Sequence, residues 1–121
     1  MNIHEYQAKE IFSAFDIPVP RGRVTLTADQ VERAAKMMGG HCVVKAQIYA
    51  GGRGKGTFTT GYQGGVKLFR TATEVYEGAK AMLGNVLVTK QTGPEGRRVR
   101  KLIVAGAPEI EKEFYLAVLL D

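Results

Sequence analysis

The sequence predicts a small α/β (α+β) domain in which helices flank β-strands and a glycine-rich flap joins two of the strands. Segments with apolar residues at helical spacing alternate along the chain with short runs rich in β-branched residues. One loop, residues 51–56, carries four glycines in six positions. With 121 residues, the chain has room for one small domain.

The composition is that of an ordinary globular protein, with 45% apolar and 24% charged residues. No apolar run approaches the roughly 18 residues of a membrane span, and the N-terminal residues lack the features of a secretory signal. The single cysteine, Cys42, lies in an apolar run and cannot form an internal disulfide. We therefore expect a reduced, intracellular protein with Cys42 in its core.

The first predicted element is a helix over residues 3–15, which ends before two closely spaced prolines. We expect Asn2 to cap it, with Glu5 completing a capping box. His4 lies in the first turn, and we expect a partly exposed structural histidine there. The apolar face predicted from the spacing comprises Ile3, Ala8, Ile11, Phe12 and Phe15.

An extended segment at 22–26 precedes a second helix, which Thr27 caps and the glycines at 39–40 end. The buried side of this helix is predicted to contain Ala28, Val31, Ala34, Ala35 and Met38. A strand over residues 42–47 follows. Its run at 42–44 does not alternate, which predicts burial on both faces.

Lys45 interrupts this apolar strand, and the glycine loop that follows holds Arg53 and Lys55. Because a lone buried ammonium is costly, Lys45 needs a partner or an anionic ligand, unless it lies at an exposed strand edge. Glycine-rich backbone and cations can together form an anion-binding concavity. These residues alone leave two interpretations open: a nucleotide-phosphate site and a solvated surface loop.

Two familiar phosphate motifs do not fit this loop. A Walker loop requires lysine directly after its second glycine, where Thr57 stands here. A dinucleotide fingerprint matches Gly52 and Gly54, but Thr57 again replaces the third glycine. Residues 57–60 are β-branched or aromatic and favour a strand over a helix. The loop is therefore predicted to return into a strand as a mobile flap.

Beyond the flap, the sequence predicts a strand at 64–69 and a third helix that Thr71 caps and Gly84 ends. The apolar face of this helix is expected to contain Val75, Ala79, Met82 and Leu83. Two further strands, at 86–89 and 99–104, flank a turn.

A last apolar strand is predicted at residues 113–120, which we expect to dock on a part of the protein absent from this chain. The net charge of +5 is compatible with nucleic acid or with anionic small molecules. The densest basic run, residues 97–101, lacks interleaved aromatic residues and is expected to be an exposed hairpin. We therefore expect no nucleic-acid partner, and keep a stand-alone basic nucleic-acid-binding domain as a minor alternative.

Six motifs occur in order at residues 1–9, 43–47, 50–55, 64–66, 87–92 and 113–116. Together they resemble the N-terminal part of the β subunits of succinate–CoA ligase (succinyl-CoA synthetase, ADP-forming). The resemblance extends over all 121 residues.

This resemblance implies the first half of an ATP-grasp domain, with a mixed sheet, flanking helices and the flap. It implies a leading helix and linker at 1–20, the N-terminal ATP-grasp subdomain at 21–112, and the first strand of a second subdomain at 113–121. The resemblance also implies that the chain is a fragment, inactive alone.

The resemblance further implies the residues that bind ATP, the nucleotide substrate. Lys45 resembles the lysine on the phosphates, Gly52, Arg53 and Gly54 resemble the flexible loop over them, and Glu113 resembles the glutamate on the ribose side. No catalytic residue and no metal ligand is implied in these 121 residues, because the Mg²⁺ ligands of the family lie in the second half.

The family's reaction joins succinate and CoA at the expense of ATP, through a phosphohistidine on the α subunit. Neither His4 nor His41 is therefore assigned that role, and the implied partners are an α subunit, succinate and CoA, without a membrane.

Ala105 and Gly106 replace a usual hinge glutamate beside adenine, which leaves the choice between ATP and GTP open. A related acid such as malate is the alternative substrate. The implied compartment is the bacterial cytoplasm, or the mitochondrial matrix in a eukaryote.

Overall fold

The computed structural model describes residues 3–120 and confirms the α+β class. None of its helices is long and apolar enough to cross a bilayer. The elements, in chain order, are α1 (Glu5–Ala14), β1 (Gly22–Thr25), α2 (Ala28–Met37), β2 (Cys42–Ala46), the 3₁₀ turn η1 (Arg53–Lys55), β3 (Thr57–Phe58), β4 (Val66–Phe69), α3 (Ala72–Met82), β5 (Val86–Val88), β6 (Arg97–Arg98) and β7 (Leu102–Gly106).

The strands form two sheets, one with the order β1-β7-β2-β4 and a smaller one with the order β3-β5-β6. Every pairing between these strands is antiparallel, so the expected mixed sheet is wrong. The reason lies in the position of β7. The strands β1 and β2, which α2 connects, run in the same direction, but β7 lies between them and runs opposite to both.

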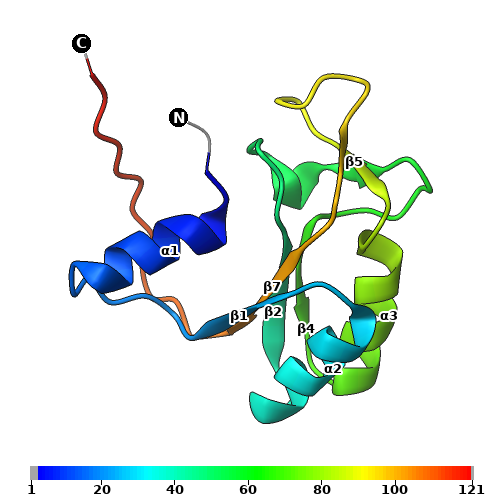
Figure 1. Ribbon diagram of the computed structural model, residues 1–121, viewed down its shortest axis with the longest axis horizontal. Coiled ribbons are helices and arrows are strands. Elements are labelled where there is room, and N and C mark those ends of the chain that lie inside the picture. The colour runs from blue at the N-terminus through cyan, green and yellow to red at the C-terminus, as the bar shows by residue number, and fades with distance from the viewer. Residues whose placement is uncertain (1–2, 121) are drawn as a thin grey trace.

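Helices α2 and α3 pack side by side on one face of the larger sheet (Figure 1). Their predicted apolar faces and the inward side chains of the strands form the core. Along β2, Cys42, Val44 and Ala46 are buried, whereas Val43 and Lys45 on the opposite face are only half-buried. The expected burial of β2 on both faces is therefore wrong, because the second face has an incomplete cover.

Both core helices begin and end as predicted. The side-chain oxygens of Thr27 and Thr71 accept hydrogen bonds from the backbone N–H groups three residues on, each at 3.2 Å. Gly39 and Gly84, which follow the helices, have φ values of +78°. Glycine adopts this left-handed conformation without strain and so ends both helices.

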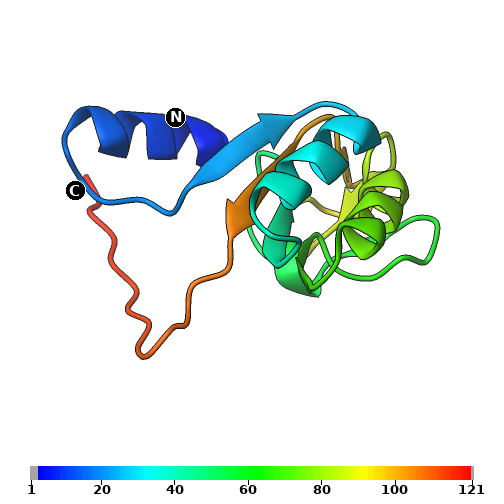
Figure 2. The ribbon, with the colours of Figure 1, turned by 90° about the horizontal axis from the view of Figure 1, so that it is seen from below.

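Helix α1 lies on the opposite side of the larger sheet from α2 and α3 (Figure 2). It begins at Glu5, with His4 at the N-cap position, so the predicted start at residue 3 is wrong. The expected cap, Asn2, lies outside the described residues. The expected capping role of Glu5 is also wrong, because Gln7 accepts the hydrogen bond from the His4 N–H at 2.8 Å and Glu5 has other partners. No residue of α1 is buried.

After β7 the chain leaves the sheet on the side of α1 (Figures 1 and 2). The strand predicted over residues 113–120 does not form, and its side chains are exposed. An apolar run becomes a strand only when another strand satisfies its backbone, and no strand described here pairs with it. The predicted strand at 99–104 instead starts at Leu102 and continues to Gly106, while Arg97–Arg98 pairs with β5 as an exposed hairpin.

Candidate functional site

Lys45 lies on the face of the larger sheet that α1 covers incompletely. It is paired with Ile103 of β7, and Ile103 is paired in turn with Val24 of β1. The three residues therefore form one row across three strands. The side chain of Lys45 is 26% exposed, so Lys45 is neither fully buried nor at an exposed strand edge.

The glycine loop after β2 turns back at η1 and returns into β3, which confirms the predicted strand-to-strand connection. Gly52 has a φ of +75°, which L side chains rarely adopt. A side chain at Gly56 would come within 3 Å of β5. At Gly54 no atom lies within 4 Å of an added Cβ, so the packing of the loop does not require that glycine.

The turn places Arg53 beside Lys45, and a carboxylate from α1 lies between the two cations. Glu5 Oε1 accepts a hydrogen bond from Lys45 Nζ at 2.9 Å, and Glu5 Oε2 accepts one from Arg53 Nη2 at 2.8 Å. Arg53 Nη1 also donates to the backbone oxygen of Ala46 at 2.7 Å. Lys9 Nζ lies 3.7 Å from Glu5 Oε1. We call Glu5, Lys9, Lys45 and Arg53 the ion cluster.

The electrostatics of the ion cluster stabilise a charged Glu5. Burial by itself raises the pKa of its carboxyl group, but hydrogen bonds from Lys45 and Arg53 and the charges of those side chains outweigh burial and lower the pKa to about 2. Burial lowers the pKa of the Lys9 ammonium, against the opposing effect of Glu5. The cluster therefore contains three basic side chains around one ionised carboxylate.

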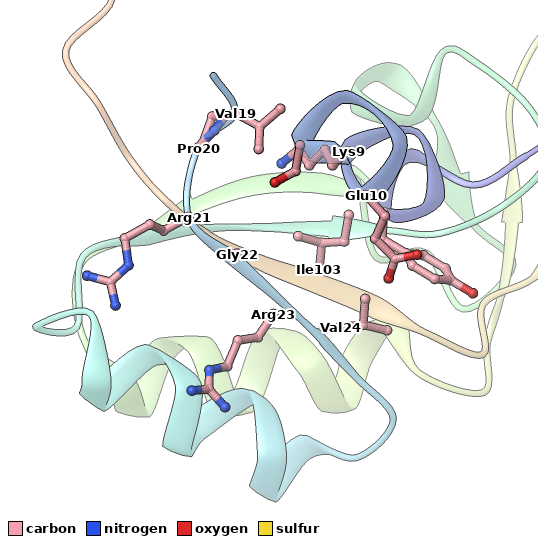
Figure 3. Close-up of a pocket in the computed structure, with 11 residues that line it drawn as sticks. Lys9, Glu10, Val19, Pro20, Arg21, Gly22, Arg23, Val24 and Ile103 are labelled. Atoms are coloured by element: carbon pink, nitrogen blue, oxygen red, sulfur yellow. The ribbon is translucent and has the colours of Figure 1, made fainter. Parts of the chain in front are cut away.

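Two hollows adjoin this cluster. One, of about 370 Å³, opens at the flap. It is lined by Ile3, Glu5, Ile48, Tyr49, Ala50, Gly51, Arg53 and Gln91. The other, of about 330 Å³, lies between α1 and the sheet edge and is mainly apolar, with Val24 and Ile103 from the strands opposite Lys9 and Glu10 from the helix (Figure 3).

The remaining predicted residues are not gathered at this site. Glu113 lies in the exposed segment after β7, without a hydrogen bond or ion pair to the described residues. Ala105 lies inside β7, between Val43 and Gly22. Within residues 3–120, no three His, Cys, Asp or Glu side chains come together as a metal-binding group.

The two histidines lie apart from any acid–base arrangement. His4 stacks on the Tyr49 ring at 4.0 Å, and burial together with Lys101 and Arg53 lowers its pKa. His41 is exposed before β2. Cys42 is buried as predicted, and burial raises the pKa of its thiol.

Sequence reasoning missed the role of Glu5, which it interpreted as a helix cap. It also missed Gln47, whose Oε1 accepts a hydrogen bond from the Tyr6 N–H at 3.1 Å. Both belong to the motifs at residues 1–9 and 43–47. The available signal was an acid in the first motif and one cation in each of the next two, Lys45 and Arg53. Nothing local indicates that segments 40 residues apart would meet.

Comparison with known proteins gives one consistent result. The ATP-grasp domain family matches residues 2–121. Succinate–CoA ligase [ADP-forming] β subunits are 64% identical in Trichlorobacter lovleyi, 61% in Geobacter sulfurreducens and 50% in Geobacillus thermodenitrificans. Each alignment covers all of this chain but only 30% of the relative, so the chain spans about a third of the length of these curated proteins.

Proposed function

Because the chain belongs to the ATP-grasp family, we propose that it supplies the phosphate-binding part of the ATP site in the β subunit of a succinate–CoA ligase (ADP-forming). The observation that carries this proposal is the convergence of Lys45 and Arg53 on one anion, at 2.9 and 2.8 Å. The ammonium and the guanidinium that donate to this carboxylate are also suitable hydrogen-bond donors to a phosphate group.

In this proposal Lys45 and Arg53 bind the phosphates of ATP, and Gly52 and Gly54 let the loop approach them. Lys45 acts as a point charge, whereas the planar guanidinium of Arg53 can donate two parallel hydrogen bonds. Both cations stabilise negative charge where it develops during phosphoryl transfer. The hydrogen bond from Arg53 to Ala46 orients the guanidinium before the nucleotide arrives.

We further propose that the base of the nucleotide uses the apolar hollow beside β1 and β7. Val24 and Ile103 share the row of Lys45 and provide an apolar surface for a planar ring. Ala105 lies on the same sheet face, two residues after Ile103, and offers no carboxylate to a base. The main-chain groups of β7 are paired with β1 and β2, so the choice between ATP and GTP would depend on main-chain groups beyond this strand.

The whole protein is proposed to form succinyl-CoA from succinate and CoA while ATP is converted to ADP and phosphate. The reaction would pass through a phosphohistidine on an α subunit, and the proposed compartment is the cytoplasm. Residues 1–20 would be the leading helix and linker, 21–112 the first ATP-grasp subdomain, and 113–121 the start of a second one that contributes Glu113. Bound Mg²⁺ would neutralise the phosphates. The ligands of Mg²⁺ are assigned outside this chain, and within residues 3–120 no three His, Cys, Asp or Glu side chains come together as a metal-binding group.

The proposal is tested in the full-length protein purified with its α subunit. Lys45→Ala should abolish ATP-dependent phosphorylation of the α subunit, because the phosphates lose one of the two cations proposed to bind them. Lys36→Ala, on the exposed side of α2, is the matched control and should label normally. Near-normal labelling of Lys45→Ala would rule out the role assigned to Lys45.

A further inference from the structure

Helix α1 is attached to the rest of the domain through polar groups. Besides the ion cluster, the Tyr6 N–H donates to Gln47 and Lys101 Nζ donates to the Tyr6 hydroxyl at 3.2 Å. The helix buries none of its residues, and Phe12 and Phe15 are 47% and 76% exposed. Its own apolar side chains therefore contribute little to holding it in place, since apolar burial is the main term that fixes a helix to a domain.

The carboxylate of Glu5 occupies the place that the proposed function gives to a phosphate. Each of its oxygens faces a different cation, and the side chains of Glu5, Lys45 and Arg53 are all between 21% and 26% exposed. A nucleotide phosphate brings more negative charge and more acceptor oxygens to the same two donors. A phosphate on the same two donors would lie close to the carboxylate of Glu5, so the two negative charges would repel each other there.

We propose that Glu5 is an internal competitor for the nucleotide phosphate, which occupies Lys45 and Arg53 in the empty site and leaves together with α1 when phosphate binds. This inference rests on the proposed function, because it concerns the occupancy of the same two cations. It assigns α1 a regulatory part: the helix closes the site when no nucleotide is present.

An opposite effect of Glu5 has to be weighed. A carboxylate between two cations can also hold them in place and so strengthen binding by pre-organisation. Here Arg53 keeps its bond to Ala46 without Glu5, and the backbone of Lys45 is fixed between β4 and β7. Glu5 therefore orients only the ammonium of Lys45, whereas its negative charge opposes a phosphate at both cations. Competition is thus the larger effect, and the observed affinity is reduced by the fraction of molecules in which Glu5 occupies the cations.

The decisive experiment measures the dissociation constant of ATP by calorimetry in the full-length protein with its α subunit. Glu5→Gln keeps the length of the side chain but removes its charge, and should bind ATP about 3- to 30-fold more tightly. Glu32→Gln breaks an ion pair of similar length on α2, 3.0 Å to Lys36, and should leave the constant unchanged. An unchanged or weaker affinity of Glu5→Gln, or an equal gain in both variants, overturns the inference.

A double variant separates this inference from the proposed function. Lys45→Ala should weaken ATP binding whether or not Glu5 is replaced. If Lys45→Ala binds ATP normally, the proposed function fails. If Lys45→Ala binds weakly and Glu5→Gln binds no better than the wild type, the proposed function stands and the competition by Glu5 is ruled out.

Hydrogen exchange of the wild-type protein gives an independent readout that needs no substitution. Adding ATP should speed the exchange of backbone amides in α1, because the helix loses its ionic attachment. It should slow exchange in the loop at 51–56, which gains a ligand. Unchanged or slower exchange in α1 on ATP binding would mean that the helix stays in place, and would contradict the proposal.

Discussion

The two faces of the larger sheet are built from different chemistry. Under α2 and α3, Val31, Val75 and Val44 pack without exposure to solvent. Under α1, the contacts are the ion cluster and two hydrogen bonds, and two hollows beside them remain open. One face therefore supplies the stability of the domain, while the other leaves charged groups in positions where a ligand can reach them.

Apolar periodicity alone does not distinguish these faces. The spacing in α1 is as helical as that in α2, yet Ile11 and Phe12 are about half-exposed whereas Val31 is completely buried. The pattern indicates that a helix has an apolar side, but the partner of that side is fixed by the rest of the fold. For α1, the described residues provide only a partial partner, with Val24 and Ile103 across an open hollow.

The largest expected effect comes from removing a core aromatic. Phe58→Ala should lower the free energy of unfolding by about 3–5 kcal/mol, because Phe58 is 1% exposed and its loss leaves a cavity. Phe12→Ala on α1 should cost less than about 1 kcal/mol, since half of that ring is in solvent. Urea unfolding of both variants checks the pair. A loss at Phe12 as large as that at Phe58 would mean that α1 is covered in the assembled protein.

A smaller effect is expected from acid, and it concerns the α1 face. The pKa of Glu5 is about 2 in the fold and near 4.5 ordinarily, so the folded state favours the ionised carboxylate. Its contribution is complete above pH 4.5 and is lost as the pH falls toward 2. The shift corresponds to roughly 3 kcal/mol, which solvent screening at this partly exposed site reduces to about 1–2 kcal/mol.

The difference between wild type and Glu5→Gln isolates this contribution from other groups that titrate in acid. Urea unfolding at a series of pH values should show the two proteins converging as the pH falls below 4.5. A constant difference between them down to pH 2 would contradict the pKa of Glu5 and with it the ionic attachment of α1.

Much of the core face could be predicted from the sequence because its signals are local. Thr27 and Thr71 cap their helices, Gly39 and Gly84 end them, and the apolar residues between them lie in the core. The return of the glycine loop into a strand was also predictable, since residues 57–60 favour a strand and disfavour a helix.

The α1 face could be predicted only in part. The sequence indicated that Lys45 needs an anion, but not that Glu5, 40 residues away, provides one. The strand direction within the sheet was equally out of reach, because the insertion of β7 between β1 and β2 is a property of topology. The run at 113–120 has the composition of a strand, and composition does not supply the neighbour that a strand requires.

The smallest expected effect distinguishes two lysines of the same cluster. Lys9 Nζ is buried, has no hydrogen-bond partner among the described residues and lies 3.7 Å from Glu5, whereas Lys45 Nζ makes a short bond to the same carboxylate. A buried ammonium that is poorly paired contributes little, and an apolar side chain of similar length can replace it at no cost. Lys9→Met should therefore change the free energy of unfolding by less than about 0.5 kcal/mol, or stabilise the fold slightly.

Lys45→Met is the matched comparison for Lys9→Met, because it makes the same change on the other lysine. It should destabilise the protein measurably, since it removes one of the two short bonds to Glu5 and leaves that carboxylate with Arg53 and the distant Lys9. Urea unfolding at pH 7 ranks the two variants. Equal losses at Lys9 and Lys45 would mean that the cluster acts through its summed charge, and that the short contacts of Glu5 do not select the two cations proposed to bind phosphate.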